Sequence, residues 1–233
     1  MRPPSFVLFD YSADMVAAWR AAVAALPSTL PLPEIRQGDL IEHSVAFDCV
    51  VSPGNSFGRL EGGLDAVIAR AVSPAPHDAA DIAESIRLLR AIHMDCSAGF
   101  QTPGSCYIMD LTAVGRLRSA GVGSAGFRYI AHTPTMIVPA VLAGEARKTP
   151  YFCTYAVLAA VRRFNATVAP DNAIRSVAIS GLGTGVGGLS PDVCARLMVL
   201  AWRHFHESLN GLRNDDDWDK MTAWTEEIDA ALL

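Results

Sequence analysis

Two glycine-containing stretches carry the residues that are best suited to chemistry. The first spans 50–70 and reads VVSPGNSFGRLEGGLDAVIAR: a short apolar run, a Pro-Gly-Asn turn, a glycine pair, and an apolar helical pattern with Asp65 near its start. A strand end, a loop and a helix N-terminus therefore meet here. Backbone N–H groups at such a place favour phosphate and other anions. The stretch predicts an anion-binding loop.

The second stretch, 181–188, reads GLGTGVGG and joins an apolar strand pattern at 176–180 to a long helix that begins near Ser190. Consecutive glycines leave backbone amides unshielded, so the loop can form a concave nest for an anion. Loops that follow neighbouring parallel strands meet at the same edge of a sheet. The two stretches could therefore hold one diphosphate between them.

Gly183, Gly185 and Gly188 also have the G-x-G-x-x-G spacing of dinucleotide-binding loops. A Rossmann unit requires a further strand with an acid at its end about 20 residues on, whereas a polar helical tail follows here. The Gly-Lys-Ser/Thr of a P-loop is also missing. A different nucleotide-sugar or dinucleotide enzyme that uses the same two loops stays open as an alternative.

Alternating strand and helix patterns would position these loops. Short apolar runs predict strands at 6–9, 34–37, 48–51, 105–111, 128–131 and 176–180. Helical spacing of apolar residues predicts helices at 12–26, 62–72, 78–93, 151–165, 190–210 and 217–233, with loops at 96–104 and 116–126. The alternation indicates an α/β fold, a three-layer α/β/α sandwich with a mixed, mostly parallel central sheet. We expect one domain over 1–233, with a motif-bearing core at about 35–203.

Composition narrows the range of partners. The 233-residue chain has a net charge of −5, one acidic run at 215–217 and no basic stripe, so no nucleic-acid polymer is expected. No apolar run approaches the length of a membrane span, and the N-terminus lacks a signal pattern. We expect a soluble, cytoplasmic protein without a membrane partner. Cys and His residues show no convincing ligand spacing, so no metal is predicted.

Several motifs in a fixed order resemble the macrodomain family. They are G-D-L at 38–40, V-S-P-G-N at 51–55, G-G-L-D at 62–65 and G-T-G-V-G at 183–187. With S-P-G-N-S-F-G at 52–58 and T-P-T-M at 133–136, the chain looks closest to a divergent branch. Macrodomains are ADP-ribose-binding modules that include ADP-ribosyl hydrolases. The resemblance implies ADP-ribose or an ADP-ribosylated macromolecule as the partner, and no cofactor.

Residue by residue, the resemblance implies that Asp39 accepts a hydrogen bond from the adenine amino group and that Asn55 holds the distal ribose. Asp65, ten positions after Asn55, would orient or activate water, so Asp65 and Asn55 are the candidate catalytic residues. The two glycine loops would hold the near and far sides of the diphosphate. The other ligand-binding candidates are Leu40, Ser52, Phe57, Gly62, Gly63, Leu64, Gly181, Gly183, Thr184, Gly185, Val186 and Gly187.

The chain departs from the family pattern at three places. Ser52 replaces the first Asn of the N-A-A-N loop, Leu60 and Glu61 shorten the glycine run, and Gly187 stands where an aromatic residue is often found. Glu61 would repel a diphosphate unless its side chain points away. Phe57 is a candidate to supply the missing stacking ring. ADP-ribose binding is thus better supported than hydrolysis.

Each of these residues also has a purely structural alternative. Asp39 and Asn55 could be turn residues, and Asp65 could only complement the helix dipole. His132 lies at a strand end that faces the expected cleft, yet a lone His is more often hydrogen-bonded structure than a catalyst. The sequence predicts ADP-ribose binding, with hydrolysis of mono-ADP-ribosyl or O-acetyl-ADP-ribose esters as the catalytic form and a non-catalytic ADP-ribose reader as the alternative.

Overall fold

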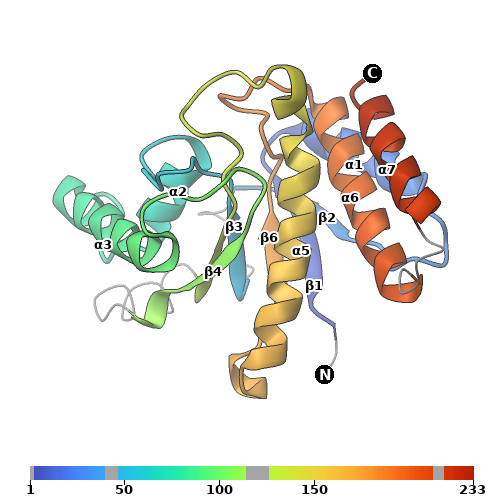
Figure 1. Ribbon diagram of the computed structural model, residues 1–233. Helices are drawn as coiled ribbons and strands as arrows, with labels where there is room; N and C mark the ends of the chain where they lie inside the picture. Colours follow the sequence, from blue (N-terminus) through green and yellow to red (C-terminus); the bar gives the residue numbers. More distant parts are fainter. Residues whose placement is uncertain (1–2, 40–46, 114–125, 212–217) are drawn as a thin grey trace.

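The computed structural model describes residues 3–39, 47–113, 126–211 and 218–233, and its strands form one six-stranded sheet in the order β2-β1-β6-β3-β5-β4 (Figure 1). β1 runs parallel to β2 and β6, and β3 runs parallel to β5 and β6. β4 is antiparallel to β5. The mixed, mostly parallel sheet predicted from the sequence is confirmed. The strands span Ser5–Asp10 (β1), Glu34–Gln37 (β2), Cys49–Ser52 (β3), Tyr107–Asp110 (β4), Tyr129–His132 (β5) and Ser176–Ile179 (β6).

Helices cover both faces of the sheet, so the three-layer sandwich is confirmed as well (Figure 1). α1, α5 and α6 pack on one face, α2 and α3 pack on the other, and α7 lies against α6. The helices span Ala13–Ala24 (α1), Gly63–Ala71 (α2), Ala79–Ser97 (α3), Thr149–Thr167 (α5), Pro191–Gly211 (α6) and Trp218–Ala230 (α7). Short 3-10 turns occur at Leu111–Ala113, Gly144–Lys148 and Pro170–Asn172.

Side-chain alternation along β1 shows how the two layers are filled. Phe6 and Leu8 face the layer of α1, α5 and α6, where they pack with the fully buried Trp19. Val7 and Phe9 point to the opposite face, into the core under α2 and α3. Successive strand residues point to opposite faces, so a strand buried on both sides is apolar throughout. This is why short uninterrupted apolar runs marked the strands in the sequence.

Helix boundaries differ from the sequence prediction mainly at α3. The predicted helix ended near residue 93, with a loop from 96 onward, whereas α3 continues to Ser97 and ends where Ala98 adopts a left-handed conformation. Asp78 caps the other end by accepting hydrogen bonds from the backbone N–H groups of Ala80 and Asp81. The prediction was too short because the last turn is mostly polar. The predicted loop at 116–126 falls, except for its last residue, outside the described residues.

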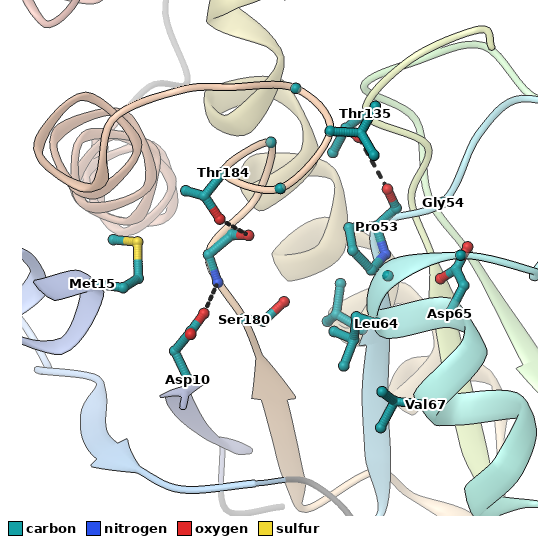
Figure 2. A pocket seen from close by; sticks show the side chains of 18 of the residues that line it. Asp10, Met15, Pro53, Gly54, Leu64, Asp65, Val67, Thr135, Ser180 and Thr184 are labelled. Atoms are coloured by element: carbon teal, nitrogen blue, oxygen red, sulfur yellow. Dashed lines mark hydrogen bonds between the residues drawn. The ribbon is translucent and has the colours of Figure 1, made fainter. Parts of the chain in front are cut away.

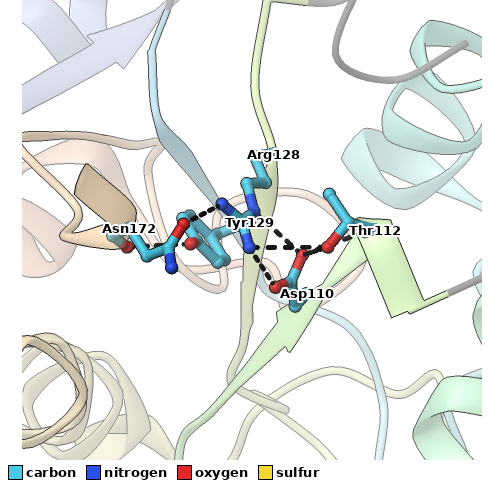
Figure 3. Close-up of polar contacts among 5 residues, drawn as sticks. All are labelled: Asp110, Thr112, Arg128, Tyr129 and Asn172. Atoms are coloured by element: carbon cyan, nitrogen blue, oxygen red, sulfur yellow. Dashed lines mark hydrogen bonds and ion pairs between the residues drawn. The ribbon is translucent and has the colours of Figure 1, made fainter. Parts of the chain in front are cut away.

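A polar cluster ties β4 and β5 together at the end of the sheet where β5 begins (Figure 3). The Arg128 guanidinium donates to both carboxylate oxygens of Asp110, at 3.1 and 2.7 Å, and to Asn172 Oδ1 at 2.7 Å. Thr112 adds hydrogen bonds from its hydroxyl and its backbone N–H to Asp110. Burial raises the pKa of Asp110, but the hydrogen bonds from Arg128 and Thr112 outweigh this and leave the pKa below its ordinary value. The cluster therefore favours the ionised carboxylate.

We expect Asp110→Asn to lower the free energy of unfolding by only about 0.5 kcal/mol at neutral pH, because the pair is partly exposed and screened by solvent. A depressed folded-state pKa contributes stability above the unfolded pKa, and this contribution disappears as the pH falls through the folded value. The free energies of unfolding of wild type and variant, measured with urea, should therefore become equal in acid. Glu84→Gln, which removes an exposed ion pair with Arg87, is the control. A difference that persists unchanged in acid would contradict the ionic role.

Candidate functional site

A cavity of about 800 Å³ opens at the carboxyl ends of the parallel strands (Figure 2). Five segments far apart in the sequence form its walls: the end of β1 with the start of α1, the end of β2, the loop from β3 into α2, the loop after β5, and the loop from β6 into α6. Ligands of open α/β sheets bind in such a crevice, where neighbouring loops diverge. In Figure 2, Asp10 and Met15 lie on one side of the cavity, and Asp65 and Thr135 lie on the other.

The loop after β3 brings Asn55 to the cavity in a constrained conformation. Asn55 Oδ1 accepts the backbone N–H of Phe57 at 3.0 Å, and its backbone pairs with Met136 in an isolated bridge. The turn role considered for Asn55 is therefore real, and it occupies the amide oxygen. The amide N–H₂ is the group that Asn55 can offer to a ligand in the cavity.

α2 begins at the wall of the cavity with a bare N-terminus. Gly62 is its N-cap, has no side chain to satisfy the first-turn N–H groups, and lines the cavity together with Gly63 and Leu64. A Cβ added at Gly62 or Gly63 would meet no atom within 4 Å, so the backbone is open to the cavity. Unsatisfied N–H groups and the positive end of a helix dipole attract an anion.

The two residues that shorten the glycine run, Leu60 and Glu61, themselves line the cavity. Leu60 adopts a left-handed conformation with φ 56° and is buried in the core beneath α2 and α3. Glu61 Oε2 accepts hydrogen bonds from Arg59 at 3.2 and 2.7 Å, and Arg90 lies 3.6 Å from Oε1. Two arginines thus balance the Glu61 charge, which weakens its repulsion of an anion.

The loop after β6 forms the facing wall. Gly181 N–H donates to Asp10 Oδ2 at 3.0 Å, and Thr184 Oγ1 donates to the Gly181 carbonyl at 3.1 Å (Figure 2). Gly183 has φ 74°, a conformation that favours glycine. A Cβ at Gly187 would lie 2.5 Å from the Gly183 carbonyl oxygen. This close approach explains why glycine stands where the family often has an aromatic residue.

Asp65 lies in the first turn of α2 at the edge of the cavity, and its side chain is only 5% exposed. Burial raises the pKa of Asp65 from 3.8 to about 6, and a hydrogen bond from the Ser52 hydroxyl offsets part of this shift. The Ser52 Oγ donates to Asp65 Oδ1 at 2.7 Å. Ser52, which is predicted to contact the ligand, is instead buried and hydrogen-bonded to this carboxyl group.

Most of the residues predicted from the sequence line the same cavity, two described ones do not, and one lies outside the described residues. Ser52 is fully buried, Phe57 packs its ring against Phe100 with 5.5 Å between centroids, and Leu40 lies outside the described residues. Phe57 is 46% exposed and does not reach the cavity as a stacking ring. The predicted residues that line the cavity are Asp39, Asn55, Gly62, Gly63, Leu64, Asp65, Gly181, Gly183, Thr184, Gly185, Val186 and Gly187.

Sequence reasoning does not identify Asp10, which ends β1 and lines the cavity. An acid at the end of an apolar strand is the signal that could have identified it. His132, for which the sequence favours a structural role, lies behind the cavity wall, where a Cβ added at Gly54 would be 2.8 Å from its Nε2. Within the described residues, no cluster of three or more His, Cys, Asp or Glu side chains could hold a metal ion. In the same part of the chain, no helix is both long and apolar enough to cross a membrane.

The chain is similar to known proteins of one family. The family model described as "Macro-like domain" matches residues 36–210, most of the chain, and the protein therefore belongs to this family. An uncharacterised protein of Aquifex aeolicus (strain VF5) is 28% identical over 193 residues, which cover 82% of this chain and 94% of that protein.

Solved macrodomains show a more distant likeness. A mutant Oceanobacillus iheyensis macrodomain with ADPR has a TM-score of 0.48 and 13% identity, covering 81% of this chain and 89% of its own. A Trypanosoma brucei macrodomain in complex with ADP has a TM-score of 0.46 and 17% identity, covering 92% of this chain and 87% of its own.

Proposed function

We propose that this protein binds ADP-ribose, free or attached to a macromolecule, in the cavity between the two glycine loops. The observation that carries the proposal is the meeting of the uncapped α2 N-terminus and the loop after β6 on facing walls of one cavity. Both walls present backbone N–H groups, which suit the oxygens of a diphosphate. Membership of the Macro-like domain family supports this ligand over other diphosphates.

The proposed orientation of the ligand follows from the positions of Asp39, Asp65 and the Asn55 amide. Asp39 lines the cavity beyond β2 and is placed to accept a hydrogen bond from the adenine amino group. Asn55 and Asp65 follow β3, which lies three strands away from β2 in the sheet, and the distal ribose would rest there. The ligand would thus extend along the carboxyl edge of the sheet, with its diphosphate between the loops.

The proposal extends to hydrolysis of an ADP-ribosyl ester, with Asp65 as the general base. At a pH above the Asp65 pKa of about 6, the side chain is an ionised carboxylate and can accept a proton from water. The water oxygen then forms a bond to the anomeric carbon or to the ester carbonyl carbon. The bond to the leaving group breaks, and that group departs with the electron pair. A reader without turnover is the second candidate, favoured by the deep burial of the Asp65 side chain.

Calorimetric titration of the whole protein with ADP-ribose, NAD, ATP and AMP tests the binding proposal. We expect ADP-ribose to bind most tightly, because it alone combines the adenine, the diphosphate and an unblocked distal ribose. Tight binding of another nucleotide without binding of ADP-ribose would overturn the proposal. Incubation with a mono-ADP-ribosylated protein and with O-acetyl-ADP-ribose then separates a hydrolase, which releases ADP-ribose, from a reader, which does not.

Asp39→Ala should weaken ADP-ribose binding about tenfold and leave ribose 5-phosphate binding unchanged, because only the first ligand carries an adenine amino group. A hydrogen bond to a charged acceptor contributes on the order of 1.5 kcal/mol. Asp14→Ala removes an exposed carboxylate outside the cavity and is the control for net charge. Equal losses for both ligands in Asp39→Ala would refute the adenine role of this residue.

A further inference from the structure

Asp10 ends β1 at the edge of the cavity and accepts three hydrogen bonds there. Its carboxylate accepts the backbone N–H of Ser12 on Oδ1 at 2.9 Å. The other oxygen, Oδ2, accepts the backbone N–H of Gly181 at 3.0 Å (Figure 2). The backbone carbonyl of Asp10 accepts the N–H of Gly38 at 3.0 Å. Because β1 lies between β2 and β6 in the sheet, this one residue connects the segments that follow both neighbouring strands.

The two N–H groups on the Asp10 side chain require an acceptor with two oxygens. Ser12 is the N-cap of α1, and Gly181 lies at the start of the loop after β6. A carboxylate offers two acceptor oxygens, whereas an amide offers one. Hydrogen bonds to a charged acceptor are also stronger than those between neutral groups. The half-buried Asp10 side chain therefore links α1 to the loop after β6.

Packing against α1 restricts Gly181 as well. A Cβ added to Gly181 would lie 2.7 Å from Met15 Sδ and 3.2 Å from Asp10 Oδ2. Met15 is only 1% exposed and belongs to the core under α1, α5 and α6, so its side chain has little room to move. The hydrogen bond and this packing together define where the loop after β6 leaves the sheet.

Beyond Gly181, the loop after β6 uses its carbonyl groups and leaves N–H groups available. The carbonyl oxygens of Gly183 and Gly185 accept hydrogen bonds from N–H groups further along the chain. Within the described residues, the backbone N–H groups of Gly185, Val186 and Gly187 donate no hydrogen bond, and all three residues line the cavity. Successive available N–H groups suit phosphate oxygens. Their positions depend on where the loop begins.

We propose that Asp10 is a positioning residue for the diphosphate of the ligand. Its carboxylate acts through the Gly181 N–H and without contact to the ligand. It fixes the start of the loop after β6 and thereby the N–H groups that face the phosphate oxygens. The inference rests on the proposed function. It runs against simple electrostatics, because Asp10 brings a negative charge to the wall of an anion site, where like charges repel.

Asp10→Asn and Asp10→Ala distinguish positioning from repulsion by the sign of their effect. If Asp10 only repelled the diphosphate, both variants would bind ADP-ribose more tightly than wild type. In the positioning role, Asn keeps one acceptor oxygen for two N–H groups and Ala keeps none. We therefore expect calorimetry to show affinity reduced about threefold in Asp10→Asn and about tenfold in Asp10→Ala. Wild-type or tighter binding by Asp10→Ala would overturn the inference.

Adenosine separates an effect on the diphosphate from an effect on the whole fold. Both substitutions keep the backbone carbonyl that accepts the Gly38 N–H, so the segment that leads to Asp39 stays attached. Adenosine carries no phosphate, and its affinity, followed by NMR titration, should be the same in wild type and variants. Equal losses for adenosine and ADP-ribose would refute the positioning role. Asp14→Ala, which removes an exposed carboxylate of α1 outside the cavity, should change neither affinity.

Hydrogen exchange in the ligand-free, full-length protein tests the contact itself. The Gly181 N–H should exchange at least about tenfold faster in Asp10→Ala than in wild type, because its acceptor is lost. The Gly38 N–H, which is bonded to the backbone of the same residue, should exchange at an unchanged rate. Unchanged exchange at Gly181, or equal acceleration at both amides, would overturn the inference. If Asp10→Ala does not fold, Asp10→Asn, which has almost the same shape, serves for both measurements.

The two kinds of measurement separate this inference from the proposed function. If the wild type does not bind ADP-ribose while Gly181 exchange still accelerates in Asp10→Ala, the proposed function fails and the link between Asp10 and the loop stands, without a diphosphate to position. If the wild type binds ADP-ribose and Asp10→Ala binds it equally well, the positioning role fails alone.

Discussion

Gly185→Glu should reduce ADP-ribose affinity by more than about a hundredfold while leaving the fold intact. Gly185 lines the cavity, its φ is not positive, and a Cβ added there meets no atom within 4 Å. The glutamate side chain therefore fits without strain and fills the space expected for the diphosphate. Its carboxylate would face the phosphate charges, and like charges brought together in a binding site cost several kcal/mol.

Calorimetry at fixed ionic strength measures this loss, and thermal unfolding verifies that the variant is folded. Two further substitutions at the same position divide the effect into its parts. Gly185→Ala adds almost no volume and should bind within a few-fold of wild type, whereas Gly185→Gln adds the bulk without the charge and should lie between the two. Binding of ADP-ribose to Gly185→Glu at wild-type strength would show that the diphosphate lies elsewhere.

Asp65→Asn should have two opposite effects, more stability and less turnover. The folded-state pKa of about 6 exceeds the ordinary value of 3.8, so the free energy of unfolding falls as the pH rises between these two values. Removing the buried charge should increase the free energy of unfolding at neutral pH by on the order of 2 kcal/mol. The variant amide also keeps an acceptor for the Ser52 hydroxyl. Ester hydrolysis should fall by at least about a hundredfold.

Thermal unfolding from acid to neutral pH measures the first effect. The melting temperature of Asp65→Asn should exceed that of wild type by several degrees at neutral pH, at about 2–4 °C per kcal/mol for a chain of this size, and should match it in acid. Asp95→Asn, which alters an exposed carboxylate on α3, should show no such crossover. A less stable variant would contradict the prediction that burial of the ionised Asp65 carboxylate destabilises the fold. Undiminished hydrolysis would remove Asp65 from the mechanism.

Each departure of this chain from the familiar macrodomain pattern is matched by a local contact or conformation around the cavity. Ser52 no longer offers an amide to the cavity, but its hydroxyl fixes one oxygen of Asp65. Glu61 interrupts the glycine run, but Arg59 and Arg90 balance its charge. Gly187 replaces an aromatic residue, and its backbone lies too close to Gly183 to leave room for a side chain. The proposed diphosphate site between the α2 N-terminus and the loop after β6 is thus retained, although residues around it differ from the family pattern.

The sequence by itself determined the elements and the two loops. The apolar runs of β3 and β6 and the helical periods of α2 and α6 are local patterns, and local patterns set secondary structure before any long-range contact forms. Gly62 and Gly183 were identifiable because bare backbone between a strand and a helix suits few purposes other than tight turns and anion binding. The alternation of these elements predicted the α/β/α sandwich, and the resemblance to macrodomains supplied most of the residues that line its cavity.

Only the tertiary structure decided where individual side chains point. Phe57 turns to Phe100 instead of the cavity, and Asp10 reaches across 171 residues to hold Gly181. His132 and Asp65 both lie against Gly54 because β5 lies beside β3 in the sheet, an order that periodicity does not encode. The reason is physical: local patterns fix which residues are buried, whereas strand order and register fix which buried groups become neighbours. The chemistry of Asp65 depends on those neighbours.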